Sequence, residues 1–378
     1  MKILYVITKS EIGGAQTHVL DLLKEGLRLG HQVSLISSPG GWLEDQVRDL
    51  NIKFFPNKFF KNSYNPANLF LALGAVRKVA KELNPDVVHC HSGGGGFYGR
   101  LATFGLPVKR VFTVHGWSFR PGAPMLQRII SLVAELLMRP LTDKFICVSS
   151  YDQNIGISSG VINKKSSVVI HNGVAVPDIS KKEAKEKTTI IFAGRLSAPK
   201  RQDVFLKSIA LLDSEIKNKI NINIIGDGPN KESIENLYES LGLNSLVSIK
   251  SLPTELMGKE YSNSDILVLI SDYEAFPMVI IEAMSYGLPV VVSSVGGIPE
   301  AVNASVGALV SKNNPEDFAK EIKALILNKE DREKKGQNAR KLIEEKFTIN
   351  KMLDKTFSVY RQLVSEDNLD SLQDNTKI

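Results

Sequence analysis

The sequence predicts an α/β protein with two doubly wound parallel sheets, and three observations support this fold class. Short apolar runs alternate with helical patterns from Lys2 to Ser159, and a second series of the same kind begins at Thr188. The chain has 378 residues, which is too long for one ordinary core. Strands that alternate with helices are typical of parallel sheets covered by helices, so we expect two such domains.

The first series contains six strand and helix pairs. The expected strands are the apolar runs ILYVI, QVSLIS, KFF, DVVHC, RVFTV and KFICV. The helical patterns that follow them cover residues 15–29, 42–50, 66–83, 94–104, 125–139 and 151–159. Apolar residues recur at helical spacing in these segments, which is the primary signal for an amphipathic helix.

The second series predicts the second domain. Its expected strands are TIIFAG, INIIG, LVSIK, DILVLI, PVVVSS and GALVS, with helical patterns between most of them. The junction falls at 172–187, where NGVAVPD passes into the charged run KKEAKEK. We assign residues 1–172 to the first domain and 173–349 to the second. A last helix over 350–364 could pack back on the first domain, and we expect residues 365–378 to form a loose tail.

The composition excludes several classes of protein. The longest apolar runs have the length of a strand, far below the ~20 residues of a membrane-spanning helix. Residues 1–8 lack the apolar core and cleavage site of a signal peptide, so we expect a cytoplasmic protein. Cys90 and Cys147 each end an apolar run. We expect two buried free thiols there, with neither a disulfide nor a metal site.

Positive charge is concentrated in the first half of the chain. Residues 1–177 contain 20 Lys and Arg against 11 Asp and Glu, whereas the remainder contains 27 against 30. The first half should therefore meet an anionic surface or substrate, which could be nucleic acid, phospholipid or a diphosphate carrier. No nucleic-acid-binding motif is present, so nucleic acid is not expected as a partner.

The predicted site centres on residues 273–300, which read YEAFPMVIIEAMSYGLPVVVSSVGGIPE. Pro277 and an apolar run separate Glu274 from Glu282, and proline suits the first turn of a helix. Glu274 would then lie on the loop before the helix and Glu282 within it. A carboxylate among apolar residues needs a partner, which favours a ligand site over a solvated helix face. Free backbone N–H groups at the helix start also attract phosphates.

Loops that follow the expected strands of the first domain supply further candidates, because ligands of doubly wound sheets lie beyond the carboxyl ends of the strands. Gly13 and Gly14 stand at a helix start, where either a diphosphate or a plain tight turn would fit. His115 follows RVFTV and is a candidate for hydrogen bonding to a substrate. Four glycines at 93–96, after His91, permit close approach of either a ligand or a helix.

In the second domain, the loop after TIIFAG contains three cations, Arg195, Lys200 and Arg201. Fixed cations at one strand end suit a diphosphate, and the alternative is a solvated basic turn. Asp227, Gly228 and the following proline form a turn after INIIG that could do no more than start a helix.

Six motifs taken together resemble glycosyltransferase family 4. They are GGAQTHVL near the start, HNGV at 171–174, GRLSAPK at 194–200, GDGP at 226–229, E-x7-E at 274–282 and GGIPE at 296–300. Each motif is weak alone, but the six occur in the expected order over about nine-tenths of the chain. The resemblance implies a GT-B architecture, in which two Rossmann-like domains face each other across a cleft. The second domain would hold a nucleotide-sugar donor and the first the acceptor.

The same resemblance assigns roles to particular residues. Arg195 and Lys200 match the pair that neutralises the donor diphosphate, and this charge grows as the glycosidic bond breaks. Glu282 matches the ribose-binding carboxylate, and Glu274 the residue that holds hydroxyls of the donor sugar. His115 matches the histidine that reaches the sugar from the first domain. The other donor-binding positions are Gly13, Gly14, Gly226, Phe276, Pro277, Met278 and Val279. Pro199 and Arg201 depart from the usual motif but retain its charges.

The resemblance implies a retaining transfer of a hexosyl or N-acetylhexosaminyl group, with no cofactor and no metal ion. The usual proposal for the family is front-face attack, in which the departing phosphate accepts the proton of the acceptor. Glu274 and Glu282 are not a glycosidase pair, because they would hold opposite ends of the donor. A UDP-sugar is favoured over a GDP-sugar as donor.

Two segments predict contact with an anionic membrane surface. Residues 53–61 read KFFPNKFFK, and residues 120–144 place cations around the apolar run 125–138. Cations at lipid headgroups and aromatics at the boundary are typical of peripheral proteins, although a strand edge and a core helix would explain the same residues. The hypothesis is a peripheral enzyme on the inner face of the cell membrane. It would extend a glycan linked to a lipid diphosphate, in bacterial surface polysaccharide biosynthesis.

Two other functions would also use these binding residues. A nucleotide-sugar epimerase of the same fold would release an altered nucleotide-sugar without any acceptor. A non-catalytic nucleotide-sugar-binding protein would have little need for His115 at the sugar.

Overall fold

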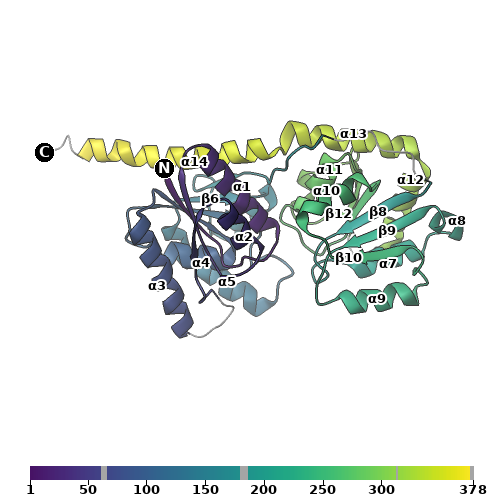
Figure 1. Cartoon of the computed structure of the whole chain (residues 1–378), viewed down its shortest axis with the longest axis horizontal. Helices are drawn as coiled ribbons and strands as arrows, with labels where there is room; N and C mark the ends of the chain where they lie inside the picture. The colour runs from purple at the N-terminus through teal and green to yellow at the C-terminus, as the bar shows by residue number, and fades with distance from the viewer. Residues whose placement is uncertain (61–65, 179–185, 312–313, 375–378) are drawn as a thin grey trace. The chain divides into compact units, whose positions relative to one another are not determined.

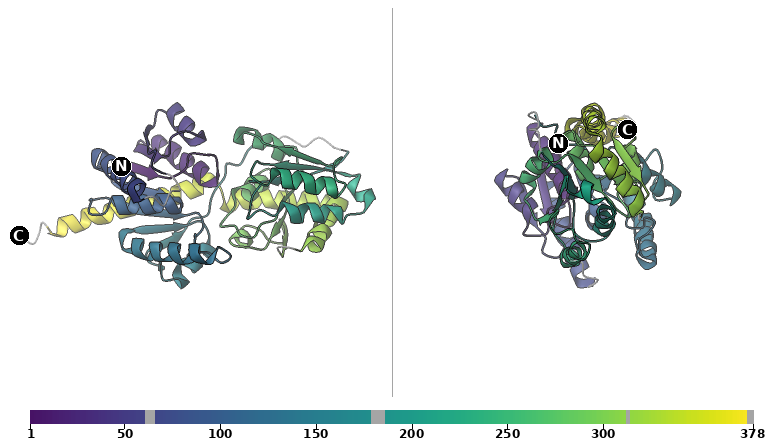
Figure 2. Two further views of the ribbon diagram at one scale, coloured as in Figure 1. Left: turned by 90° about the horizontal axis from the view of Figure 1, so that it is seen from below. Right: turned by 90° about the vertical axis from the view of Figure 1, so that its right-hand side faces the viewer.

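A computed structural model describes residues 1–60, 66–178, 186–311 and 314–374. Contacts divide the chain into two units, the first made of Met1–Asn172 with Met352–Ile378 and the second of Gly173–Lys351. Each unit is a parallel sheet with helices on both faces (Figures 1 and 2). The α/β fold class expected from the alternating pattern is confirmed.

The first sheet has seven parallel strands in the order β3-β2-β1-β4-β5-β6-β7. The strands are β1 (Lys2–Val6), β2 (Gln32–Ser37), β3 (Lys53–Pro56), β4 (Val87–His91), β5 (Lys109–Val114), β6 (Lys144–Cys147) and β7 (Ser167–Val169). All five residues of β4 are buried, as expected for a central strand covered on both faces. The chain reverses direction across the sheet between β1 and β4, so their carboxyl ends flank the switch point at which ligands of such sheets bind.

Helices of the first unit form two groups. The helices are α1 (Gly14–Arg28), α2 (Trp42–Asp49), α3 (Pro66–Leu83), α4 (Ser92–Ala102), α5 (Met125–Met138), a 3-10 turn η1 (Arg139–Leu141) and α6 (Ser150–Ser158). Helix α1 packs on α2, whereas α4 packs on both α3 and α5. Helices α3, α4 and α5 are labelled together in the lower part of this unit, and α1 is labelled above them (Figure 1).

The glycines at 93–96 serve the packing of α4 on the sheet. A Cβ atom at Gly95 would lie 2.7 Å from the Val6 carbonyl oxygen, and one at Gly96 would lie 2.6 Å from the Phe112 ring. At Gly99, one turn further on, it would lie 2.3 Å from the Cys90 sulfur. Close approach of α4 to the sheet therefore accounts for Gly95 and Gly96.

The second sheet has six parallel strands in the order β10-β9-β8-β11-β12-β13. The strands are β8 (Thr188–Ala193), β9 (Ile220–Ile225), β10 (Val247–Lys250), β11 (Ile266–Leu269), β12 (Val290–Ser293) and β13 (Gly307–Val310). The helices are α7 (Gln202–Ala210), α8 (Ser214–Lys217), α9 (Lys231–Ser240), α10 (Thr254–Ser262), α11 (Met278–Ser285), α12 (Pro315–Leu327) and α13 (Lys329–Lys346), with a 3-10 turn η2 (Ile298–Glu300).

The last helix, α14 (Ile349–Asp374), is longer than the sequence suggested. We expected a helix over 350–364 and a loose tail from 365, but the helix continues through residue 374, and 375–378 lie outside the described residues. Phe357 and Tyr360 of α14 are buried in the first unit, where Phe357 stacks on His31. Polar composition at 365–374 was a poor guide because a helix already formed upstream needs no new nucleus to continue.

The structure differs from the sequence prediction for residues 53–60, which belong to one of the two segments expected at a membrane. Three of the four phenylalanines of KFFPNKFFK serve the core, since Phe60 is buried and Phe55 and Phe59 pack against the core cluster. Lys61 lies outside the described residues. The interpretation of this segment as an exposed aromatic patch is therefore wrong, and the alternative of a strand edge is correct. No helix among the described residues is long and apolar enough to cross a membrane.

Candidate functional site

The centre of the second unit's site is an ion pair between Lys200 and Glu274. The Lys200 Nζ donates to Glu274 Oε1 at 2.5 Å, and the Ser271 hydroxyl donates to the same oxygen at 2.6 Å. Both charged side chains are largely enclosed, with exposed fractions of 16% and 13%. A charge-assisted pair held by a third group is pre-oriented, which suits a site that must bind polar ligand groups.

Backbone pairing brings these two side chains together from distant parts of the chain. The Asp272 N–H donates to the Pro199 carbonyl and the Arg201 N–H to the Ile270 carbonyl, each at 2.9 Å. The loop after β8 therefore lies along the carboxyl end of β11, with Lys200 opposite Ser271 in a short antiparallel bridge. This is the edge of the sheet at which doubly wound folds bind ligands.

Glycines of the GDGP and GGIPE motifs support both loops. Gly226 and Gly228 have φ of +157°, and a Cβ atom there would lie 2.1 Å from the Gly194 oxygen and 2.4 Å from the Leu196 oxygen. Gly296 has φ of +58°, and its added Cβ would lie 1.7 Å from the Glu274 carbonyl oxygen. Side chains at these positions would displace the loops that carry Lys200 and Glu274. Gly226, predicted to bind the substrate, thus also has a packing role.

The other two cations of the basic loop differ from each other. Arg195 is exposed, and no ion pair of its guanidinium occurs among the described residues. Arg201 is paired with Asp203 at 2.8 Å and with Asp272 at 3.4 Å. These carboxylates pair with Arg201 as Glu274 pairs with Lys200, and the role of Arg201 as a third cation for a diphosphate stays a prediction.

Glu282 lies inside α11, which begins at Met278 directly after Pro277 as the sequence predicted. The Tyr261 hydroxyl donates to Glu282 Oε2 at 2.9 Å, which fixes the carboxylate. Burial raises the pKa of Glu282 above its ordinary value, and the bond from Tyr261 opposes this shift. A carboxyl group so placed retains one oxygen that can accept from a ligand hydroxyl.

The remaining residues predicted to bind the donor line the loop before α11. The Phe276 side chain is buried against Phe347, with ring centroids 5.3 Å apart, so only its backbone could contact a ligand. Pro277, Met278 and Val279 are partly exposed at the start of the helix. Residue 277 caps α11 without a side-chain hydrogen bond, which leaves the first N–H groups of the helix to a ligand.

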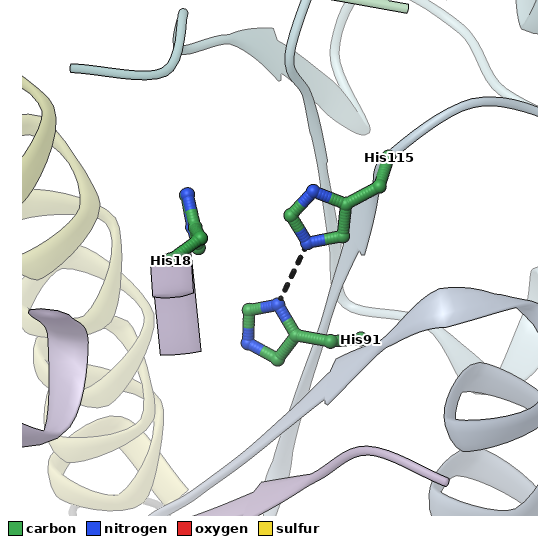
Figure 3. Close-up of side chains that lie close together, drawn as sticks. All are labelled: His18, His91 and His115. Atoms are coloured by element: carbon green, nitrogen blue, oxygen red, sulfur yellow. Dashed lines mark hydrogen bonds between the residues drawn. The ribbon is translucent and has the colours of Figure 1, made fainter. Parts of the chain in front are cut away.

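In the first unit, three histidines from separate elements gather at the switch point (Figure 3). His18 lies on α1, His91 ends β4, and His115 follows β5. His91 Nδ1 and His115 Nε2 are 3.1 Å apart, within hydrogen-bonding distance. The His18 ring lies edge-on to that of His115, with centroids 5.0 Å apart. The sequence singled out His115 and left His91 undecided, but it missed His18.

All three imidazoles are neutral in this environment. Burial lowers the pKa of His18 to about 4, and it lowers the pKa of His91 and of His115 well below the ordinary value. His18 Nδ1 lies 3.2 Å from Asn172 Oδ1, an acceptor, so Nδ1 bears the proton and Nε2 is a lone-pair acceptor. The Nε2 atoms of His18 and His91 are buried and have no hydrogen-bond partner among the described residues. Such atoms can bind the hydroxyl groups of a sugar.

His115 also borders a pocket of about 110 Å³ in the first unit. Ser92 and Gly93 of the α4 start, Trp117 of the loop after β5, and Ser131 and Glu135 of α5 contribute to its walls. Glu135 is paired with Arg100 at 2.8 Å, so its charge serves the structure of the pocket wall. The pocket therefore joins His115 to the inner face of α5.

Gly13 and Gly14 begin α1. Gly13 is the residue before the helix and provides no side-chain cap, so the first N–H groups of α1 can receive an anion. An added Cβ at Gly13 would meet only the flexible Gln16 side chain, at 2.8 Å. Tight packing therefore does not explain this glycine. The two explanations given by the sequence, close approach of a diphosphate and a tight turn, both remain open.

Among the described residues, only His18, His91 and His115 form a cluster that could hold a metal ion, with ligand atoms within 4.8 Å of one another. Neutral imidazoles are ligands for zinc and similar ions. Cys90 and Cys147 are buried and free, as the sequence predicted.

Three further site residues, Ser271, Tyr261 and His18, were not singled out from the sequence. Ser271 lies three positions before its partner Glu274, and Tyr261 lies 21 positions before Glu282, but a lone serine or tyrosine gives no periodic or spacing signal. His18 falls on the buried stripe of α1 beside Val19 and Leu22. Two signals could have found it: its place in the GGAQTHVL motif, and a polar residue within an apolar helical pattern.

Two family models match consecutive parts of the chain. The one described as Glycosyltransferase Family 4 matches residues 12–176, and the one described as Glycosyl transferases group 1 matches residues 177–342. The two parallel α/β units and the likeness to solved structures define the GT-B fold. The family models show that the chain is a glycosyltransferase. The chain belongs to glycosyltransferase family 4.

Individual relatives agree with this assignment. The chain is 29% identical over 321 residues to the O-antigen biosynthesis glycosyltransferase WbnH of Escherichia coli, covering 83% of this chain and 87% of the relative. It is 28% identical over 355 residues to a UDP-Gal:alpha-D-GlcNAc-diphosphoundecaprenol alpha-1,3-galactosyltransferase of the same organism, covering 88% and 89%. The structure of Anabaena Alr3699/HepE in complex with UDP and glucose has a TM-score of 0.83 at 18% identity, covering 96% and 100%.

Proposed function

We propose that this glycosyltransferase is a retaining enzyme that moves a hexosyl or N-acetylhexosaminyl group from a nucleoside-diphosphate sugar to a glycan linked to a lipid diphosphate. The observation that carries the proposal is the enclosed Lys200–Glu274 pair at the carboxyl edge of the second sheet. A cation for phosphate and a carboxylate for sugar hydroxyls are thus held in contact before any donor arrives. A UDP-sugar is the favoured donor, since the relative and the structural neighbour named above act on or bind uridine nucleotides.

In the proposed complex, the donor replaces the internal partners of this pair. Its diphosphate takes the Nζ of Lys200, with exposed Arg195 and the first N–H groups of α11 as further donors. Glu274 is then released to accept from the sugar hydroxyls, while Glu282, fixed by Tyr261, accepts from the ribose. As the bond to the anomeric carbon breaks, the negative charge on the leaving diphosphate grows and these cations stabilise it.

His115 is proposed to hold a hydroxyl group of the donor sugar from the first unit, and Gly13 and Gly14 to lie near the distal phosphate. A neutral imidazole suits this role, because it accepts or donates a hydrogen bond without adding a charge. The attacking hydroxyl would approach on the face that the leaving group vacates, so its proton passes to the departing phosphate and no enzymic nucleophile is needed.

The proposed reaction needs no metal ion, because Lys200, Arg195 and the helix start supply the positive charge that a cation would otherwise provide. Treating the enzyme with EDTA and passing it through a desalting column should leave its turnover within about twofold of the untreated enzyme. Loss of turnover that added Mg²⁺ or Mn²⁺ restores would contradict this part of the proposal.

The acceptor and the biological role rest on the relatives. One acts in O-antigen biosynthesis, and the other on a sugar linked to diphosphoundecaprenol. We propose by extension that this protein acts in bacterial surface polysaccharide assembly, as a peripheral protein on the inner face of the cell membrane. The excess of cations in residues 1–177 supports an anionic surface as a partner.

The direct test is a panel of UDP- and GDP-sugars, followed by product analysis. Transfer to a lipid-diphosphate acceptor with retention at the anomeric carbon is expected. An epimerase would instead release an altered nucleotide-sugar without an acceptor, and a binding protein would return the donor unchanged. Either outcome would overturn the proposed reaction.

A point variant tests the residue that carries the proposal. Glu274→Gln keeps the shape and the bond from Ser271 but removes the charge, so turnover should fall by about 100-fold. The melting temperature should change by no more than a few degrees, because the amide oxygen of glutamine can still accept from Ser271 and Lys200. Glu215→Gln is the matched control, since Glu215 also pairs with a lysine, Lys219, but on exposed α8. Full activity of Glu274→Gln would contradict the assigned role.

A further inference from the structure

The outward face of α5 is apolar and exposed. Seven side chains on this helix have exposed fractions between 40% and 77%: Met125, Leu126, Ile129, Ile130, Val133, Leu136 and Leu137. At 100° per residue they fall within an arc of about 140° on one side of the helix. Isolated exposed apolar residues are normal, but a continuous stripe of this size marks a site of interaction.

The opposite face holds α5 firmly on the first unit. Leu132 packs against the core cluster, and Met138 is buried. Glu135 accepts two bonds from the buried Arg100 guanidinium, at 2.8 and 2.9 Å. The inward side chains of α5 therefore hold the helix on the first unit, and the outward stripe takes no part in this packing.

The charges around the stripe indicate the kind of partner. Arg128 and Arg139 are exposed at the two ends of the helix, and the only carboxylate on α5, Glu135, is turned inward and neutralised. Residues 1–177 as a whole contain 20 cations against 11 anions. An apolar face with cations at its ends fits a lipid surface with anionic headgroups better than a second copy of the same basic unit, which would repel it.

We propose that the outward stripe of α5 docks on an anionic lipid bilayer, with α5 lying parallel to the membrane plane. This inference deepens the proposed function and rests on it for the identity of the acceptor. A helix of 14 residues is about 21 Å long, so it is too short to span the bilayer and fits its interface. The cations at its ends meet the headgroups while the apolar side chains enter the acyl boundary.

Docking by α5 has a consequence for the acceptor. The inner face of the same helix contributes Ser131, Ala134 and Glu135 to the pocket that His115 borders. One helix thus has lipid on one side and the predicted sugar-binding residue on the other. An acceptor anchored by a lipid chain would present its glycan within a helix diameter, about 10 Å, of this pocket.

Vesicle sedimentation of the full chain tests the surface. Wild-type protein should pellet with vesicles of phosphatidylglycerol and phosphatidylcholine at low salt, and less with phosphatidylcholine alone. The triple variant Leu126→Ser/Ile130→Ser/Leu137→Ser should reduce the bound fraction at least tenfold. The control is Leu211→Ser/Leu256→Ser/Leu327→Ser, three leucines of the second unit that are about half exposed, which should bind as the wild type does.

Other outcomes overturn the proposal. Equal binding by the α5 triple variant and the wild type would remove α5 as the docking surface, as would absence of wild-type binding to anionic vesicles. A wild-type dimer that the α5 variant abolishes, without vesicle binding, would assign the stripe to a second copy. UDP binding by calorimetry on the same variants should be unchanged. If neither the wild type nor the variants bound UDP, the result would count against the proposed function. The vesicle result would still decide whether α5 is the docking surface.

Discussion

At the residue scale, the buried histidines show how the fold sets the charge of the site. His18, His91 and His115 lie in a part of the first unit where desolvation opposes protonation, and His89 beneath them is enclosed as well. His89 is held by Tyr360 at 2.5 Å and by Thr113 at 2.7 Å. Neutral imidazoles with unpartnered nitrogens suit a ligand rich in hydroxyl groups, and they make the first unit sensitive to acid.

This arrangement predicts a pH dependence of stability. The pKa of His18 is about 4 when folded and about 6.5 when unfolded, so the unfolded chain binds the proton first as pH falls. Stability contributed by neutral His18 is therefore present above pH 6.5 and is lost as pH falls toward 4. The loss should be about 2 kcal/mol between pH 6.5 and 5.

The variant His18→Asn isolates this effect, because its amide can still donate to Asn172 but does not titrate. Urea unfolding at several pH values should show a stability difference between wild type and variant that shrinks as pH falls from 7.5 to 5. A difference that stays constant over this range would contradict the neutral state of His18.

Sequence reading at this scale succeeded where a residue belonged to a spaced motif. Glu274 and Lys200 were found as parts of E-x7-E and GRLSAPK, and the structure brings them into contact. Their pairing with each other was not predicted, because a motif specifies which residues occur but not which atoms meet without a ligand. The partners of Arg201 were not predicted either, although Asp203 lies only two positions away and Asp272 lies 71 positions away.

At the scale of elements, strands and helices were largely predictable, because buried parallel strands are continuous apolar runs. Helix α11 begins beside Pro277, and α5 begins at Met125, both as the sequence indicated. The sequence pattern did not show whether an apolar run faces the core or the solvent. The phenylalanines after β3 turned inward and the stripe of α5 stayed outside, although both segments mix aromatic or aliphatic residues with cations.

Two glycines offer a matched test of how loops hold the site. Gly296 and Gly242 both have left-handed backbones, with φ of +58° and +68°. A Cβ at Gly242 meets nothing within 4 Å, so Gly242→Ala should cost only about 1 kcal/mol for the backbone conformation. Gly296→Ala adds a clash with the Glu274 carbonyl, so it should cost at least about 2 kcal/mol more.

The variants Gly296→Ala and Gly242→Ala also separate an effect on folding from an effect on ligand binding. Urea unfolding measures the cost of each substitution, and calorimetry with UDP measures binding at a temperature where both variants remain folded. Gly296→Ala should weaken UDP binding by displacing the Glu274 loop, whereas Gly242→Ala should bind as the wild type does. Equal effects of the two substitutions would mean that contact with Glu274 is not what requires glycine at 296.

At the scale of the whole molecule, the chain closes its first unit with its last helix. Helix α14 starts where the second unit ends, and from Met352 onward it belongs to the first unit. Phe357 reaches the added Cβ position of Gly26 at 3.6 Å, and Tyr360 bonds to His89 in the central strand. The first core is therefore incomplete until the chain has been made as far as Tyr360, although β1 is its first strand.

Truncation tests this dependence. A chain that ends after Lys351 contains all of the second unit but loses the buried Met352, Phe357 and Tyr360. Each large buried side chain contributes about 2–5 kcal/mol to stability. Losing all three would therefore remove most of the free energy of unfolding of an ordinary domain, which is about 5–15 kcal/mol. The first unit should then be unfolded or digested by protease at 25 °C, while the second unit keeps its calorimetric transition. A chain that ends after Glu366 retains these three residues and should match the wild type. Protection of residues 1–172 in the shorter chain would show that this unit folds without α14.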